Sequence, residues 1–286
     1  MSPIRDFVRR RPLLTYFVLT FAISWGGFLL AVGPGGFGST NWEAETGFLP
    51  AVIAMLAGPT VAGLLVTGLI DGRAGIRSLF SRMLRWRVAI WWYAIALLTA
   101  PLLAFGALSV LSLSAPIFTA ENRAAVLLSG LLAGLSVVLE EIGWTGFAVP
   151  RLRLRYGVLT TGLIVGPLWA AWHLLQQIFV GGTYAAGLPL ALFVSLSVLG
   201  AVVQLTAYRL LLVWLYDRTK SLLLVTLMHG SLTASTIFIF RPVATGVTFL
   251  AYGWLISAGL WILVAAIILA RGDKVYRPLY NPRYGS

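Results

Sequence analysis

The amino-acid sequence predicts an all-α polytopic membrane protein with about eight transmembrane helices. Hydrophobic residues make up 59% of its 286 residues and charged residues only 10%, whereas a soluble domain has about 25% charged residues. The apolar residues stand in runs of about 20, the length of a membrane-spanning helix. They do not form the alternating segments of about 10 residues that build a membrane barrel. No stretch between the runs is long enough for a second core, so we expect one transmembrane domain over residues 1–286.

The first two spans alternate with basic and acidic segments. A basic start over residues 1–11 precedes an apolar run over 12–32. That run exceeds the core of a signal peptide, about 7–15 residues, so we interpret it as a retained span. The connection over 33–47 carries acids and no base. The second span is predicted over 48–70, and the arginine-rich residues 76–86 beyond it have the pattern of an amphipathic helix on the membrane surface.

The third and fourth spans differ in their polar content. The third is predicted over residues 89–113, where Trp91, Trp92 and Tyr93 provide interfacial anchors. The fourth is predicted over residues 125–149 and is the span that contains two adjacent glutamates. A basic turn follows it.

The remaining four spans are apolar runs separated by short turns. They are predicted over residues 158–180, 188–216, 222–239 and 247–270. Basic residues counted loop by loop alternate between rich and poor, and an even number of spans with both termini in the cytoplasm satisfies the positive-inside bias. We therefore expect a multi-pass integral protein, and we place it in the cell membrane of a prokaryote.

The net charge of +12 fits the same interpretation. A basic membrane protein gathers positive charge on its cytoplasmic side, where anionic lipids are its natural partners. The arginines are scattered through short loops and form no basic face, so we expect no nucleic-acid partner. The chain has no cysteine, which excludes disulfides, thiolate metal ligands and cysteine nucleophiles.

Four ionisable side chains fall inside predicted spans and stand out from the rest. Of nine acids only Glu140 and Glu141 lie within a span, and the two histidines of the chain, His173 and His229, both do. A charged side chain at the bilayer centre costs about 2.5–3.5 kcal/mol on insertion scales. Because each of these groups is costly alone, we predict that three helices bring them together in one polar site that water can reach.

Helical spacing adds three candidate partners to this site. Residues at i and i+4 share a helix face, and this relation joins Glu141 to Thr145, Trp169 to His173, and His229 to Thr233. Ordinary packing is an alternative role for Trp169. Arg209 lies in the sixth span, and for it we expect the side chain to snorkel to the interface.

A carboxylate with two imidazoles supports more than one chemistry. The carboxylate can activate a water as general base while the imidazoles polarise a carbonyl and stabilise the oxyanion. Glu140, His173 and His229 could equally hold a zinc ion with one open position. The helical HExxH zinc signature is absent, and the spacing leaves both alternatives open, so no cofactor is assigned beyond this zinc candidate.

The residues reached so far resemble the motifs of a known family. Glu140-Glu141 with Thr145-Gly146, then Trp169-x-x-x-His173, then His229-x-x-x-Thr233 are similar to the pattern of the CAAX prenyl endopeptidase and bacteriocin-processing (Abi, CPBP) membrane proteases. That pattern reads EExxxR, then FxxxH, then HxxxN or a variant. The resemblance covers about residues 136–235.

The resemblance implies an eight-helix intramembrane endopeptidase whose site opens towards the cytoplasm. By motif position Glu140 is the water-activating base, and His173 and His229 are its partners, as metal ligands or as oxyanion and substrate contacts. The implied substrate is a peptide bond of a membrane-associated or lipidated protein. Glu141 completes the catalytic set, and Thr145, Trp169 and Thr233 support it.

Two departures from the family pattern give rise to alternatives. The family arginine is Thr145 here and the asparagine is Thr233. Unless Arg209 reaches in from the sixth span, Glu141 lacks a counter-charge, and the two carboxylates would share a proton. A non-catalytic membrane scaffold or immunity protein of the same fold is therefore the alternative function, and a proton-coupled transporter is a more distant one.

The predicted depths of the site residues do not agree at first. At about 1.5 Å per residue, Glu140 lies about 14 Å and His229 about 10–12 Å from the ends of their spans, whereas His173 lies about 22 Å into its own. A break of the fifth span at Gly166-Pro167 would reduce this mismatch, and these residue types make such a break plausible.

Overall fold

The computed structural model describes residues 3–33, 48–114, 123–181, 184–272 and 276–278, and within them the ordered elements are all helices. Seven of these helical segments are long and apolar enough to cross a membrane, and an eighth apolar helix, α8 (Val158–Trp172), is shorter. The predicted all-α polytopic membrane fold is therefore confirmed. Most of the predicted acidic connection, residues 34–47, lies outside the described residues.

Six of the spans follow the predicted boundaries within a few residues or extend beyond them. Their helices are α2 (Pro12–Val32), α3 (Phe48–Met83), α4 (Ile90–Ser112), α10 (Leu190–Thr219), α11 (Leu222–Thr233) with the π-helix η5 (Ala234–Ile239), and α12 (Gly246–Arg271). The basic N-terminal segment also forms a helix, α1 (Pro3–Arg10), which was not predicted from the sequence.

The fourth and fifth spans are divided into pieces. The fourth consists of α5 (Arg123–Ser136), α6 (Val138–Gly143), the π-helix η3 (Trp144–Ala148) and α7 (Val149–Arg153). The fifth is α8 followed by α9 (Leu174–Gly181), with His173 between them. The predicted break at Gly166-Pro167 is wrong: α8 continues through Pro167 and ends just before His173.

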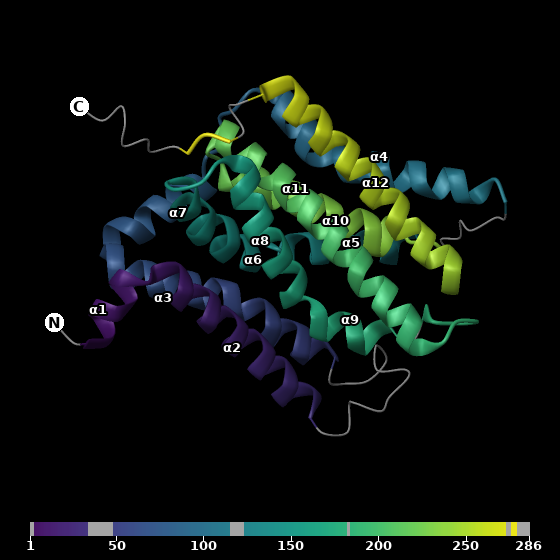
Figure 1. The fold of residues 1–286 in the computed structure, drawn as a ribbon, viewed down its shortest axis with the longest axis horizontal. Coiled ribbons are helices and arrows are strands. Elements are labelled where there is room, and N and C mark those ends of the chain that lie inside the picture. The colour runs from purple at the N-terminus through teal and green to yellow at the C-terminus, as the bar shows by residue number, and fades with distance from the viewer. Residues whose placement is uncertain (1–2, 34–47, 115–122, 182–183, 273–275, 279–286) are drawn as a thin grey trace.

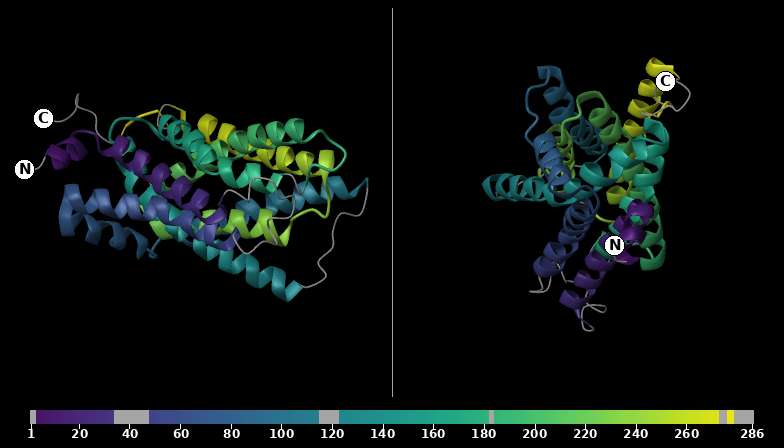
Figure 2. Two further views of the ribbon diagram at one scale, coloured as in Figure 1. Left: turned by 90° about the horizontal axis from the view of Figure 1, so that it is seen from below. Right: turned by 90° about the vertical axis from the view of Figure 1, so that its left-hand side faces the viewer.

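The helices lie side by side along one long axis (Figure 1). The pair α2 and α3 forms one side of the bundle, α4 and α12 form the opposite side, and α6, α8, α10 and α11 lie between them (Figures 1 and 2). The beginning of α1 and the end of α12 are at the same end of the bundle (Figure 2, left). The basic turns between α3 and α4 and between α10 and α11 are at that end too, which is the distribution that the positive-inside bias requires.

Ionic contacts tie the helix ends together at this basic end. Arg153 pairs with Asp217 at 3.0 Å, and Arg151 pairs with Asp71. Arg82 donates to the Tyr216 hydroxyl at 2.7 Å. These contacts join α3, α7 and α10, so the basic turns are anchored to the bundle.

Helix α3 continues beyond its membrane-spanning part and carries the segment predicted as a surface helix. A kink at Gly72, where φ is +62°, separates the two halves. A positive φ is a conformation that glycine adopts without steric cost. The second half ends at Met83, so the amphipathic helix predicted over 76–86 is present in part, as a continuation of α3.

Prolines within three of the spans create cross-links between helices. A proline has no N–H, so the carbonyl four residues before it loses its helical partner. Neighbouring segments supply the missing donors: Ser24 donates to the Met55 carbonyl released by Pro59 (2.7 Å), Ser231 to the Leu97 carbonyl released by Pro101 (3.0 Å), and Arg82 to the Gly146 carbonyl released by Pro150 (2.9 Å). Such partners are what allows proline inside a membrane helix.

Close helix contacts bring the site elements together. A Cβ atom at Gly143 would lie 2.2 Å from the Pro59 carbonyl oxygen, and one at Gly166 would lie 2.7 Å from the Cα atom of Thr206. Only glycine permits approaches this close. As a result α6 packs directly on α3, and α8 packs directly on α10.

Candidate active site

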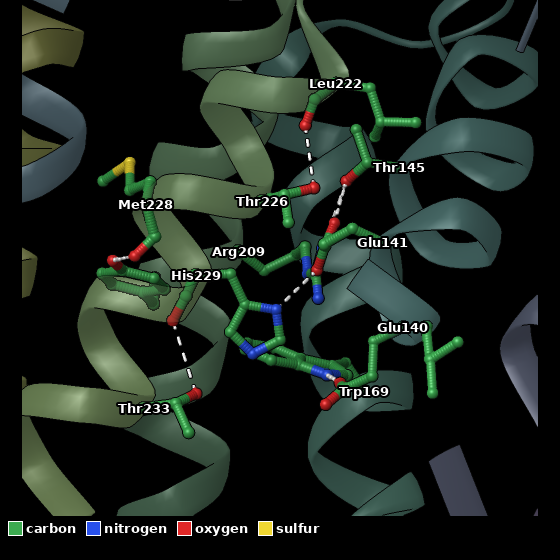
Figure 3. Close-up of polar contacts among 12 residues, drawn as sticks. Glu140, Glu141, Thr145, Trp169, Arg209, Leu222, Thr226, Met228, His229 and Thr233 are labelled. Atoms are coloured by element: carbon green, nitrogen blue, oxygen red, sulfur yellow. Dashed lines mark hydrogen bonds and ion pairs between the residues drawn. The ribbon is translucent and has the colours of Figure 1, made fainter. Parts of the chain in front are cut away.

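Glu141 on α6 is the centre of a buried polar cluster (Figure 3). Arg209 Nη1 lies 3.0 Å from both of its carboxylate oxygens. His229 Nδ1 lies 2.9 Å from Oε1, and the Thr145 hydroxyl donates to Oε2. All four side chains are buried. The ion pair and the hydrogen bonds therefore compensate the buried charge of Glu141, which would cost much free energy without such partners.

The snorkelling position expected for Arg209 is wrong. Its side chain is fully buried, and its guanidinium carbon lies 4.0 Å from the centre of the Trp169 ring while Nη1 pairs with Glu141. Arg209 thus provides the counter-charge that the absent family arginine would have given. Thr145 is short enough to leave room for it, and Nη1 is 3.4 Å from the Thr145 hydroxyl. The condition under which the two glutamates would share a proton is therefore not met.

Glu140 has much simpler surroundings than its neighbour. Its Oε2 accepts one hydrogen bond, from the indole Nε1–H of Trp169 at 2.9 Å. Its Oε1 accepts none from the part of the chain that the structure describes. Trp169 is buried, so it does pack in the core as the alternative role required, but it also binds the proposed base. Glu140 thus keeps one carboxylate oxygen for other chemistry.

The two histidines reach the cluster from different helices. His173 ends α8, and its ring centre is 5.3 Å from that of Trp169. His229 lies on α11 with its ring centre 4.9 Å from that of Trp169, at an interplanar angle of 89°. Glu140, His173 and His229 thus surround the Trp169 indole, and Glu141 joins this group through its contact with His229.

Hydrogen bonds define which nitrogen of each imidazole is free. His173 Nδ1 lies 2.9 Å from the Trp169 carbonyl, which can only accept, so Nδ1 carries the proton. His229 Nδ1 faces the carboxylate of Glu141, and we assign its proton in the same way. Each Nε2 is then a lone-pair acceptor in the neutral ring and a donor in the imidazolium form.

Thr233 contributes little to this cluster. Its hydroxyl donates to the His229 carbonyl of its own helix at 3.4 Å. No contact with the other site residues is seen in the described part of the chain. Its support is therefore limited to the backbone beneath His229.

The mismatch in depth between Glu140 and His173 disappears for a reason other than the predicted break, whereas His229 still lies only about 10 Å from the start of α11. The fourth span continues through η3 and α7 to Arg153, so Glu140 lies about 20 Å from its end at about 1.5 Å per residue. His173 follows the last residue of α8 and so lies about 22 Å from the start of that helix. The two depths agree because the fourth span is longer than predicted.

The predicted zinc ligands are not assembled into one set. Within the described residues, no three His, Asp or Glu side chains lie close enough to hold one metal ion. The free Nε2 atoms have the chemistry of metal ligands, and each ring is oriented by a second partner as such ligands usually are. Their present spacing does not fit an ion, so no step below is routed through a metal.

Arg209 is the functional residue that the sequence analysis left out of the site. Its signal was present, because it is the one base that falls inside a predicted span. Choosing between snorkelling and pairing requires the rotation of α10 about its axis, and the uniformly apolar sequence around Arg209 does not define that rotation.

Comparison with known proteins bears on the same region. The sequence model of the family described as "Type II CAAX prenyl endopeptidase Rce1-like" matches residues 121–235. This range contains every predicted site residue and Arg209. The resemblance to the CAAX protease family is confirmed.

A curated relative supports the same family. The chain is 24% identical over 150 residues to a protein named CAAX prenyl protease 2 from Methanococcus maripaludis. The match covers 50% of this chain and 49% of that protein, so the chain spans about half the length of the curated relative it matches. Both comparisons thus find similarity to CAAX prenyl proteases in sequence.

Proposed function

We propose that the protein is an intramembrane endopeptidase that hydrolyses a peptide bond with a water activated by Glu140. The single observation that carries this proposal is the contrast within the glutamate pair: Glu141 is fully paired, whereas Glu140 has one oxygen bound and one free. A general base needs such a free, oriented oxygen within reach of a water.

The proposed reaction uses only groups of this chain and the substrate. Glu140 Oε1 takes a proton from water as the water oxygen attacks the carbonyl carbon. The carbonyl oxygen gains negative charge, and a histidine whose Nε2 carries a proton stabilises it, for which His173 and His229 are the candidates. The C–N bond then breaks, and the proton on Glu140 passes to the leaving amine.

The substrate class follows from the position of the site and from the relatives. Glu140 and His229 are buried inside a membrane-spanning bundle, so the scissile bond must come from a segment that enters the membrane. The curated relative is named as a prenyl protease. We therefore propose a membrane-associated or lipidated protein as substrate.

One of the two sequence departures that suggested a non-catalytic scaffold is compensated in the structure. The scaffold alternative rested on the absence of the family arginine and asparagine, and Arg209 now supplies a buried cation to Glu141. Thr233 remains a departure. No observation specifically favours the transporter alternative.

The deciding experiment is cleavage of prenylated and unprenylated hydrophobic peptides by purified protein in proteoliposomes. Glu140→Gln removes the base with little change in shape, and we expect turnover to fall by about 10²–10⁴-fold. Asp6→Asn on α1 is the matched control and should retain activity. Turnover by the Glu140→Gln variant at the wild-type rate would refute the assignment of the base, and absence of cleavage by wild type across the peptide set would favour the scaffold.

A further inference from the structure

Trp169 contacts four ionisable side chains of the site. Its Nε1–H donates to Glu140, the face of its ring carries the Arg209 guanidinium at 4.0 Å, and its ring meets that of His229 edge to face. Only about 1% of its surface is exposed. No other single side chain in the described part of the site contacts both the proposed base and the buried cation.

The hydrogen bond to Glu140 has no substitute. In the described residues the Glu140 carboxylate accepts a hydrogen bond only from Trp169. Without that donor the carboxylate would be free to rotate about its last bond. A buried hydrogen bond to a charged acceptor is of the stronger kind, so this single N–H fixes which oxygen is bound and which is free.

The Arg209 guanidinium, which packs over the face of the same indole, has one unused edge. Nη1 pairs with Glu141, but Nε and Nη2 are buried and have no hydrogen-bond partner among the described residues. These two atoms form the side of a guanidinium that binds a carboxylate in bidentate fashion. A second carboxylate nearby would be drawn to that edge, and Glu140 is the adjacent one (Figure 3).

We propose that Trp169 is a positioning residue with two actions on Glu140: its N–H orients the carboxylate, and its ring keeps the carboxylate off the free edge of Arg209. The proposal rests on the proposed function of Glu140 as base. A Glu140–Arg209 pair would occupy the free oxygen, so the ring protects the base by separating it from the cation that Glu141 needs.

Two substitutions separate the two actions. Trp169→Phe keeps an aromatic ring and removes only the donor, and we expect kcat to fall about tenfold, the equivalent of one such hydrogen bond. Trp169→Leu removes donor and ring, and we expect about a hundredfold loss. KM should stay near the wild-type value for both, because a positioning residue acts on Glu140 and not on the substrate. Equal losses in the two variants would overturn the separating action.

The chain offers a matched control on α10. Trp214 has a buried Nε1 that, unlike that of Trp169, has no partner among the described residues. Its ring packs edge-on against Trp92, with the ring centres 5.3 Å apart. Trp214→Phe makes the same chemical change away from the site contacts. It should keep kcat within about twofold of wild type, so a tenfold loss here would overturn the specific role of Trp169.

A spectroscopic test does not depend on activity. In protein labelled with ¹⁵N-tryptophan, the indole resonance that disappears in Trp169→Phe belongs to Trp169. In Glu140→Leu, which has no acceptor, we expect this resonance to move upfield in the proton dimension as its hydrogen bond is lost. An unmoved resonance overturns the proposal whatever the enzyme does.

The two readouts distinguish failure of the inference from failure of the function. A shifted resonance together with wild-type kcat in Trp169→Phe would overturn the positioning role and leave the peptidase assignment standing. A shifted resonance in a protein that cleaves none of the peptides would overturn the proposed function, and the positioning role with it, although the bond itself would be established.

Discussion

Glu140 and Glu141 are adjacent in the sequence, yet they lie in two different regions of the bundle. Glu141 faces α10 and α11, where Arg209 and His229 bind it, and Thr145 of the following helix η3 donates a further hydrogen bond. Glu140 faces α8, where Trp169 gives it one hydrogen bond. Two neighbours on one helix point about 100° apart, so a single turn presents one carboxylate to a set of partners and the other to a sparsely bonded space. The polar partners therefore bind Glu141, which stabilises the fold, and Glu140 keeps an oxygen that is free for chemistry.

Removing the partner of Glu141 should have the largest effect on stability. Arg209→Met leaves a buried carboxylate without its cation, which typically costs about 3–5 kcal/mol. Thermal unfolding in detergent would measure the loss. The double variant Glu141→Leu with Arg209→Met removes both charges and should recover most of it. An Arg209→Met protein as stable as wild type would mean that Glu141 is not held by this pair.

Moving the arginine to its family position should have the next largest effect. Thr145 is buried beside Arg209, so Thr145→Arg adds bulk and a like charge, and we expect about 3 kcal/mol of destabilisation. Combining it with Arg209→Leu should restore stability, because the new arginine can then pair with Glu141. Two additive losses in the double variant would contradict this exchange.

Removing a single hydrogen bond to Glu141 should have a smaller effect. Thr145→Val keeps the shape of the side chain and loses the hydroxyl, which should cost about 1–2 kcal/mol. Thr145→Ser keeps the donor and serves as the control. The difference between these two variants in unfolding temperature checks the prediction.

The smallest effect on stability is expected at Glu140. Glu140→Gln should change the free energy of unfolding by about 0.5 kcal/mol or less, since the amide oxygen can still accept from Trp169. The same variant should lose its turnover. A loss of stability as large as that of Arg209→Met would show that both glutamates serve the fold, and the contrast between them would disappear.

Much of the fold could be predicted because hydropathy and the loop charges act along the chain. The span over residues 12–32 matches α2 in full, and the other boundaries lie within a few residues except where α3 and the fourth span continue. The division of the fourth span into α-helical and π-helical pieces was missed. The break at Val137 and the π-helix over Trp144–Ala148 are local backbone geometry, which a hydrophobicity pattern does not encode.

The site could be predicted as a set of residues but not as a set of contacts. Rarity inside the spans identified Glu140, Glu141, His173 and His229, and in the structure contacts through Trp169 and His229 connect them. The pairing of Arg209 with Glu141 depends on how two helices are rotated against each other. That information lies in packing between residues 68 positions apart, which one sequence does not display.

The proline-linked hydrogen bonds give the bundle a fixed axial alignment. A released carbonyl accepts from a neighbouring segment only when the two stand at matching heights, as Ser24 does for Met55 and Ser231 does for Leu97. A helix that slid by one turn, about 5.4 Å, would leave both the serine and the carbonyl unsatisfied in hydrocarbon. These bonds therefore prevent the helices from sliding along their axes. They fix the heights in the bundle at which the polar side chains of α6, α8 and α11 lie.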